Sequence, residues 1–77
     1  MTKETLRALT DSFANRKSVA YRAFRNAVIT ECGISYPTFD NYRSLTRPCK
    51  IPKLVGEKII EIVRRDYPEK LHIIEQM

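Results

Sequence analysis

The stretch Val28–Arg43, VITECGISYPTFDNYR, decides the fold of this chain. Its glycine separates two segments whose apolar residues recur at helical spacing, a pattern that predicts two helices joined by a tight turn. Gly33 suits the corner because ending a helix sharply requires a positive φ, which glycine adopts without steric penalty. Ser35 can cap the second helix through its hydroxyl, and Pro37 is tolerated there because first-turn amides have no intrahelical partner. The stretch therefore predicts a helix-turn-helix.

The segments on either side of this motif extend it into an all-α protein, a compact bundle of four to five helices. Thr2 can cap a first helix and Ser18 a second, since a hydroxyl accepts from the free amides of the first turn. Residues 45–51 lack helical periodicity, and with Pro48 among them and Pro52 directly after them they predict a loop. We expect a first helix over residues 3–14, a polar break at 15–17, a second helix ending at 32, a third over 36–44 and a fourth over 52–66.

The fourth helix and the tail carry further expectations. Gly56 weakens the fourth helix by about 1 kcal/mol relative to alanine. Tyr67 and Pro68 end it, because the residue before proline avoids helical geometry. The tail, residues 69–77, is either a short fifth helix beginning at Pro68 or an extended strand, and it either docks onto the chain's own core or forms a dimer contact. The fourth helix is expected to turn five apolar side chains inward: Leu54, Val55, Ile59, Ile62 and Val63.

Length and charge limit the class of protein. Seventy-seven residues predict a single domain over residues 1–77, with a modest core and little room for a large catalytic cleft. The net charge of +5 is uneven, because residues 16–53 hold eight basic and two acidic side chains and the remainder sums to −1. A basic segment that coincides with the helix-turn-helix is typical of a surface that neutralises phosphates.

Other functions are disfavoured by what the chain lacks. No apolar run reaches eighteen residues and no secretory leader is present, so we expect no membrane association and a cytoplasmic location. Cys32 and Cys49 lack paired spacing and are expected to be free thiols, which suits a reducing bacterial cytosol. With His72 as the single histidine, we expect no metal and no cofactor. The sequence shows no glycine-rich phosphate loop or catalytic triad, so we expect neither an enzyme nor a small-molecule substrate.

The motif resembles the phage-repressor-like (lambda repressor-like) helix-turn-helix DNA-binding family. That family's motif is about twenty residues long with glycine ninth, which sets the motif here at residues 25–44. Ile29 departs from the family pattern, which usually places a small residue where the two helices approach closely. With its flanking helices the resemblance covers roughly residues 5–66. The family's core positions fall on side chains that are all apolar or amphipathic: Val28, Cys32, Ile34, Phe39 and Tyr42.

The resemblance implies that the third helix reads bases. If its apolar face packs inward, the helical period leaves Ser44 and the four base-reading candidates outward. Asn41 offers the donor and acceptor that match adenine N6 and N7 in the major groove, a pairing worth roughly 1–3 kcal/mol of discrimination. Tyr36 and Pro37 can meet a thymine methyl group. Asp40 either accepts from cytosine N4 or pairs with a neighbouring arginine, Arg43 or Arg47. The base-reading set is therefore Tyr36, Pro37, Asp40 and Asn41.

Phosphate contacts are implied for the residues that flank this helix, since charge and reach are sufficient for them. The first of these residues begins the motif, and the rest stand at the end of the third helix or beyond it. Arg25 can alternatively lie as an apolar stem over the surface. The expected set is Arg25, Arg43, Ser44, Arg47, Lys50 and Lys53.

These residues predict a sequence-specific binder of double-stranded DNA, a small transcriptional regulator of bacterial or phage type. A single module buries only roughly 600–1,000 Å² of its surface on DNA, so we expect a homodimer at least on DNA, formed through the fourth helix or the tail. The alternative is a helical protein-interaction module, an adaptor or an antitoxin-like partner, in which the motif is architectural. Its interface would comprise the tail with four aromatic residues: Tyr21, Phe24, Tyr36 and Tyr67.

Overall fold

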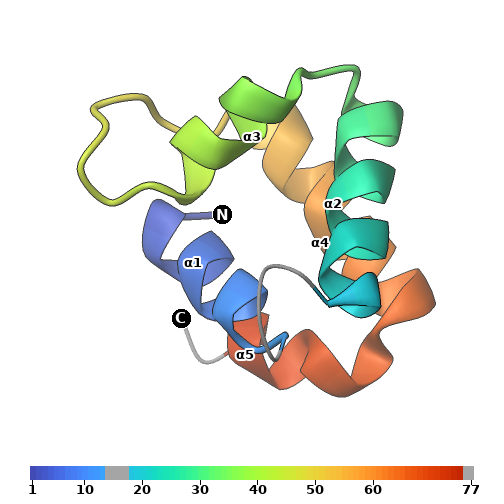
Figure 1. The fold of residues 1–77 in the computed structure, drawn as a ribbon. Helices are drawn as coiled ribbons and strands as arrows, with labels where there is room; N and C mark the ends of the chain where they lie inside the picture. Colours follow the sequence, from blue (N-terminus) through green and yellow to red (C-terminus); the bar gives the residue numbers. More distant parts are fainter. Residues whose placement is uncertain (14–17, 76–77) are drawn as a thin grey trace.

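The chain folds into a bundle of short helices in the computed structural model, which describes residues 1–13 and 18–75. Within these ranges there is no strand, and the predicted all-α bundle with a helix-turn-helix is confirmed. Figure 1 shows α1, α2 and α4 around a common interior, with α3 across one end and α5 at the other. The elements are α1 (Lys3–Asp11), α2 (Val19–Cys32), α3 (Tyr36–Arg43), α4 (Lys53–Asp66), a 3₁₀ turn (Pro68–Lys70) and α5 (Leu71–Glu75).

Three hydroxyl side chains begin the first three helices as predicted. Thr2, Ser18 and Ser35 each accept a hydrogen bond from the backbone amide three residues ahead, at N···O distances of 3.1, 3.1 and 3.3 Å. These bonds satisfy amides that have no intrahelical partner. The loop predicted over residues 45–51 is also present, between α3 and α4.

The first helix is shorter than predicted. Ser12 ends α1 because its amide donates to the carbonyls of Ala8 and Leu9, and its hydroxyl also donates to the carbonyl of Leu9. These local bonds close the last turn, after which Phe13 turns into the core. Residue 14, the predicted end of this helix, and the predicted break at 15–17 lie outside the described residues.

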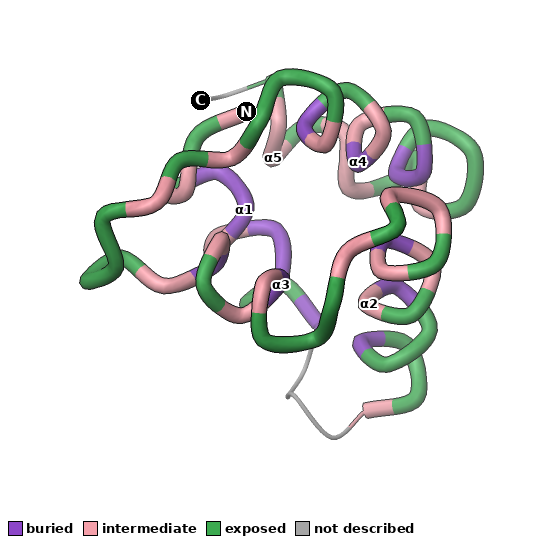
Figure 2. The backbone as a smooth tube through the Cα atoms, turned by 90° about the horizontal axis from the view of Figure 1, so that it is seen from above, coloured by how far each residue is buried: buried purple, intermediate pink, exposed green. Residues whose placement is uncertain are grey.

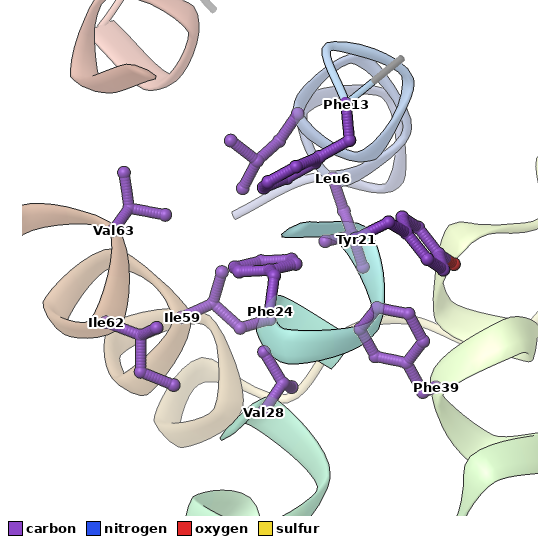
Figure 3. Close-up of a cluster of buried hydrophobic side chains, with 10 residues drawn as sticks. Leu6, Phe13, Tyr21, Phe24, Val28, Phe39, Ile59, Ile62 and Val63 are labelled. Carbon is purple, nitrogen blue, oxygen red and sulfur yellow. The ribbon is translucent and has the colours of Figure 1, made fainter. Parts of the chain in front are cut away.

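The core is centred on Phe24 of α2, whose side chain has no solvent exposure. Its ring stacks on Phe13 at a centroid distance of 5.4 Å and meets Phe39 of α3 edge-on at 6.5 Å. Figure 3 shows Phe24 with the aliphatic side chains of α4 on one side and Phe39 on the other. The inner face of α3 is therefore fixed by the same cluster that joins the other helices. The buried cluster is Leu6, Leu9, Phe13, Tyr21, Phe24, Val28, Phe39, Ile59, Ile62 and Val63.

One residue of α4 that was predicted to lie in the core is exposed. Leu54 was expected to point inward, but it is 78% exposed. Its side chain lies about 140° around the helix from buried Ile59, given 3.6 residues per turn. Gly56 instead faces the interior, and a Cβ added there would lie 3.1 Å from the Cβ of Met1. The missing side chain lets Met1 pack against the helix, which offsets the low helix propensity of glycine.

The tail is helical from Pro68 to Glu75, which agrees with the predicted short fifth helix beginning at Pro68, and residues 76 and 77 lie outside the described residues. Leu71, Ile73 and Ile74 pack against the core, and α5 contacts both α1 and α4. Lys70 adds a hydrogen bond from its Nζ to the hydroxyl of Ser12 at 3.0 Å. These apolar side chains thus cover the chain's own interior. In Figure 2 the buried stretches of α1, α2 and α4 likewise face the middle of the molecule.

Candidate nucleic-acid interface

The turn between α2 and α3 has the geometry that the sequence predicted. Gly33 is left-handed, with φ +66° and ψ +34°. Its amide and that of Ile34 both donate to the carbonyl of Ile29, which closes the end of α2. Ile29, the departure from the family pattern, is half-buried and packs against the core. Only residues 33–35 separate the two helices, so the direction of α3 is set by α2.

The two faces of α3 differ as predicted. Phe39 is fully buried, and Tyr42 packs against the core beside it. On the opposite side Tyr36 is 44% exposed, and Pro37 and Asn41 are exposed as well. We call these three side chains the outer face of α3. In Figure 1 the helix lies at the upper end of the molecule, together with the turn and the loop that follows it.

Two side chains expected on this outer face lie deeper. Asp40 is half-buried, and its Oδ1 atom is sealed from solvent. Ser44 is half-buried too, and it ends the helix as the C-cap, with its hydroxyl 3.0 Å from that of Thr46. The helical period assigned both to the outer side, but both are only half-exposed in the folded chain. We therefore leave both out of the interface that we propose.

The position of Arg43 contradicts its predicted role as a phosphate contact. Its side chain is only 5% exposed and lies against α1, where Nε donates to the hydroxyl of Thr10 at 3.0 Å. Its Nη2 atom is 3.5 Å from a carboxylate oxygen of Asp11, and the guanidinium lies 5.8 Å from the ring centre of Tyr21. The arginine thus anchors α3 to α1 and does not face outward.

Lys3 is a residue that the sequence analysis missed. Its Nζ donates to the carbonyls of Asn41 at 2.6 Å and Ser44 at 2.9 Å, at the C-terminal end of α3. The carbonyl of Asn41 also accepts the amide of Ser44 at 3.3 Å, and a cation at this end of α3 is favoured by the helix dipole. One signal was available, because a lysine in the first turn of its own helix opposes that helix's dipole. Together Lys3 and Arg43 hold α3 on α1.

Of the predicted phosphate-contacting cations besides Arg43, three are exposed, and the fourth, Arg25, is half-buried with its Nε atom sealed from solvent. Arg25 lies with its guanidinium carbon 4.4 Å from the ring centre of Tyr36, and its Nη1 donates to the tyrosine hydroxyl at 3.0 Å. The guanidinium of Arg25 therefore lies beside the N-terminal end of α3. The loop beyond the other end of α3 and the start of α4 hold three exposed cations. We call the four side chains the flanking cations: Arg25, Arg47, Lys50 and Lys53.

Most of the carboxylates with a described ion pair lie away from α3. Arg65 of α4 contacts Glu31 of α2 and its neighbour Asp66 at 2.8 and 2.9 Å, and its hydrogen bonds lower the pKa of both carboxyl groups.

Burial raises the pKa of the Cys32 thiol, which follows Glu31 in α2, and both cysteines are free as predicted. A groove of about 340 Å³ between α2 and α4 is lined by Glu31, Cys32, Leu54, Val55, Glu57, Lys58 and Glu61.

No protein-family model, curated protein or solved structure matches this chain. The resemblance to phage-repressor-like proteins thus stays a prediction from the motif. Across residues 1–13 and 18–75, none of the helices has both the length and the apolar character that a membrane span requires.

Proposed function

We propose that this chain binds double-stranded DNA and inserts α3 into the major groove, as a small transcriptional regulator. The observation that carries the proposal is the exposed outer face of α3 with flanking cations beyond both of its ends. A major groove admits one α-helix, and cations at its sides neutralise the phosphates that border it. The acidic groove between α2 and α4 lies on other elements and does not oppose this approach.

Each side chain at the proposed interface has a role. The amide of Asn41 pairs with adenine N6 and N7, while Tyr36 and Pro37 contact a thymine methyl group. Arg47, Lys50 and Lys53 contact phosphates, and Arg25 does so from its place on Tyr36. Base contacts require a helix that stays in one position. The anchoring of α3 by Lys3 and Arg43 supports this requirement.

The proposal includes a homodimer on DNA, formed through α4. One module covers too little DNA for tight specific binding, and two copies can occupy half-sites about one helical turn apart. The apolar side chains of α5 pack on the chain's own core, which leaves α4, with exposed Leu54, as the remaining predicted contact. We further propose that the protein works in the cytoplasm, where its free thiols stay reduced.

The alternative, a protein-interaction module, has less support. Two of its four proposed aromatic contacts, Tyr21 and Phe24, are 1% and 0% exposed and belong to the core. Tyr67 is half-buried and meets Phe24 edge-on at 5.8 Å. Tyr36 remains, and it lies on the outer face of α3.

The salt dependence of duplex binding tests this proposal. Affinity for a generic duplex should fall steeply as salt rises, because phosphate contacts release counterions. Arg47→Ala and Lys50→Ala should each weaken binding to all sequences alike and reduce the salt slope by about one unit. The control is Arg64→Ala, an exposed cation near the end of α4, which should change neither quantity. A salt-independent affinity, or equal effects of all three variants, would contradict the proposal.

A further inference from the structure

A cleft of about 440 Å³ separates the first four residues of the chain from the loop that follows α3. It adjoins the C-terminal end of α3, because Lys3 lines the cleft and also holds that end. The volume lies in the range of small-molecule sites in proteins. Its walls combine apolar and charged side chains: Met1, Thr2, Lys3, Glu4, Arg47, Pro48, Cys49, Lys50 and Ile51.

The cleft carries excess positive charge. Lys3, Arg47 and Lys50 line it with one carboxylate, that of Glu4. Charges of one sign along a cleft with low-dielectric walls strengthen each other's field and attract a counterion. Met1, Pro48 and Ile51 supply apolar surface next to these charges. The chemistry of the cleft thus favours an anion that carries an apolar body.

Lys3 has one donor in the cleft that an anion can take. An ammonium group has three N–H donors, and two of them point to the carbonyls of Asn41 and Ser44. The remaining partner is the Sγ atom of Cys49 at 3.5 Å, and a thiol is a weak acceptor. A carboxylate or phosphate oxygen is a stronger acceptor for a charged donor. An anion can therefore replace the thiol while the two bonds to α3 persist.

We propose that this cleft binds a small organic anion, a carboxylate or phosphate group on an apolar body, with Lys3 as its central contact. The bound anion also neutralises Arg47 and Lys50, so it competes with DNA phosphates for these two cations. This second part rests on the proposed DNA binding, whereas anion binding itself does not. The cleft would make duplex binding responsive to a small molecule.

Phenyl phosphate is the probe, titrated into ¹⁵N-labelled protein with amide shifts as the readout. The amides of Tyr42 and Leu45 should shift and saturate, because they belong to the peptide groups whose carbonyls accept from Lys3. Phenol tests the ring without the charge, and inorganic phosphate tests the charge without the ring. Phenyl phosphate should bind more tightly than either. Shifts that do not saturate, or equal binding of phenol, would overturn the anion site.

Two variants with opposite expected effects sharpen the titration. Lys3→Met should weaken phenyl phosphate about fivefold, and Glu4→Gln should tighten it about twofold, as expected when one nearby charge is removed. Glu4 is exposed, so its variant keeps the test valid even if Lys3→Met perturbs α3. Lys58→Met, in the groove between α2 and α4, is the matched control and should change nothing. If neither Glu4→Gln nor Lys3→Met changes the affinity for phenyl phosphate, the cleft is not the anion site.

A duplex assay separates this inference from the proposed function. Saturating phenyl phosphate should weaken duplex binding about tenfold beyond sodium chloride of equal ionic strength, because two phosphate contacts are lost. If phenyl phosphate saturates the cleft and the duplex affinity stays unchanged, the anion does not compete with DNA phosphates. A protein that binds no duplex but still titrates with phenyl phosphate contradicts the proposed function and leaves the anion site in place.

Discussion

Replacement of Arg43 by alanine is expected to lower the free energy of unfolding by about 2–4 kcal/mol. The side chain is 5% exposed, and its removal leaves a cavity between α1 and α3. It also removes the donor to the buried hydroxyl of Thr10 and the partner of Asp11. Urea denaturation measures the loss. The control is Arg64→Ala, whose exposed position predicts a change within about 0.5 kcal/mol.

Arg43→Lys separates charge from shape in this prediction. A lysine keeps the positive charge, but it cannot donate to Thr10 and reach Asp11 with the fixed fork of a guanidinium. We therefore expect it to recover only part of the stability. A loss for Arg43→Ala no larger than that for Arg64→Ala would show that Arg43 does not anchor α3.

Asn41→Glu is expected to weaken duplex binding by about a hundredfold while the protein stays folded. Asn41 is exposed on the outer face of α3, and a carboxylate there both loses the match to adenine and meets the phosphates with the wrong charge. Gel shifts at fixed salt measure the affinity, and circular dichroism confirms the fold.

The matched control for this charge is Val19→Glu. Val19 is 84% exposed and begins α2, at the end of that helix remote from α3. The Val19→Glu variant adds the same charge to a surface that takes no part in the proposed contact. Long-range repulsion alone should therefore lower the duplex affinity less than threefold at physiological salt. Similar losses for both variants would mean that net charge, and not the outer face of α3, governs binding.

The helix-turn-helix could be predicted from the sequence because its determinants are local. Gly33 adopts the positive φ that the corner needs, and Ser18 and Ser35 cap the helices that they precede. The family pattern placed Val28 and Phe39 in the core correctly, since both are fully buried. Each of these features depends on neighbours within a few residues.

The errors at the candidate interface concern partners that are distant along the chain. The burial of Arg43 depends on α1, which supplies Thr10 and Asp11 from more than thirty residues away. Lys3 likewise finds its acceptors 38 and 41 residues ahead. Helical period assigns a side chain to a face, but it does not say which segment covers that face. A charged residue on an outer face can therefore be buried by another helix.

The most direct test of the central claim is a map of amide shifts when a duplex with a selected binding sequence is added to ¹⁵N-labelled protein. The largest shifts should fall on the non-proline residues from Tyr36 to Asn41 and in the loop at residues 45–50, with little change at Val19 and Ala20, at the end of α2 remote from α3. Shifts concentrated in the groove between α2 and α4, with α3 unaffected, would contradict the account.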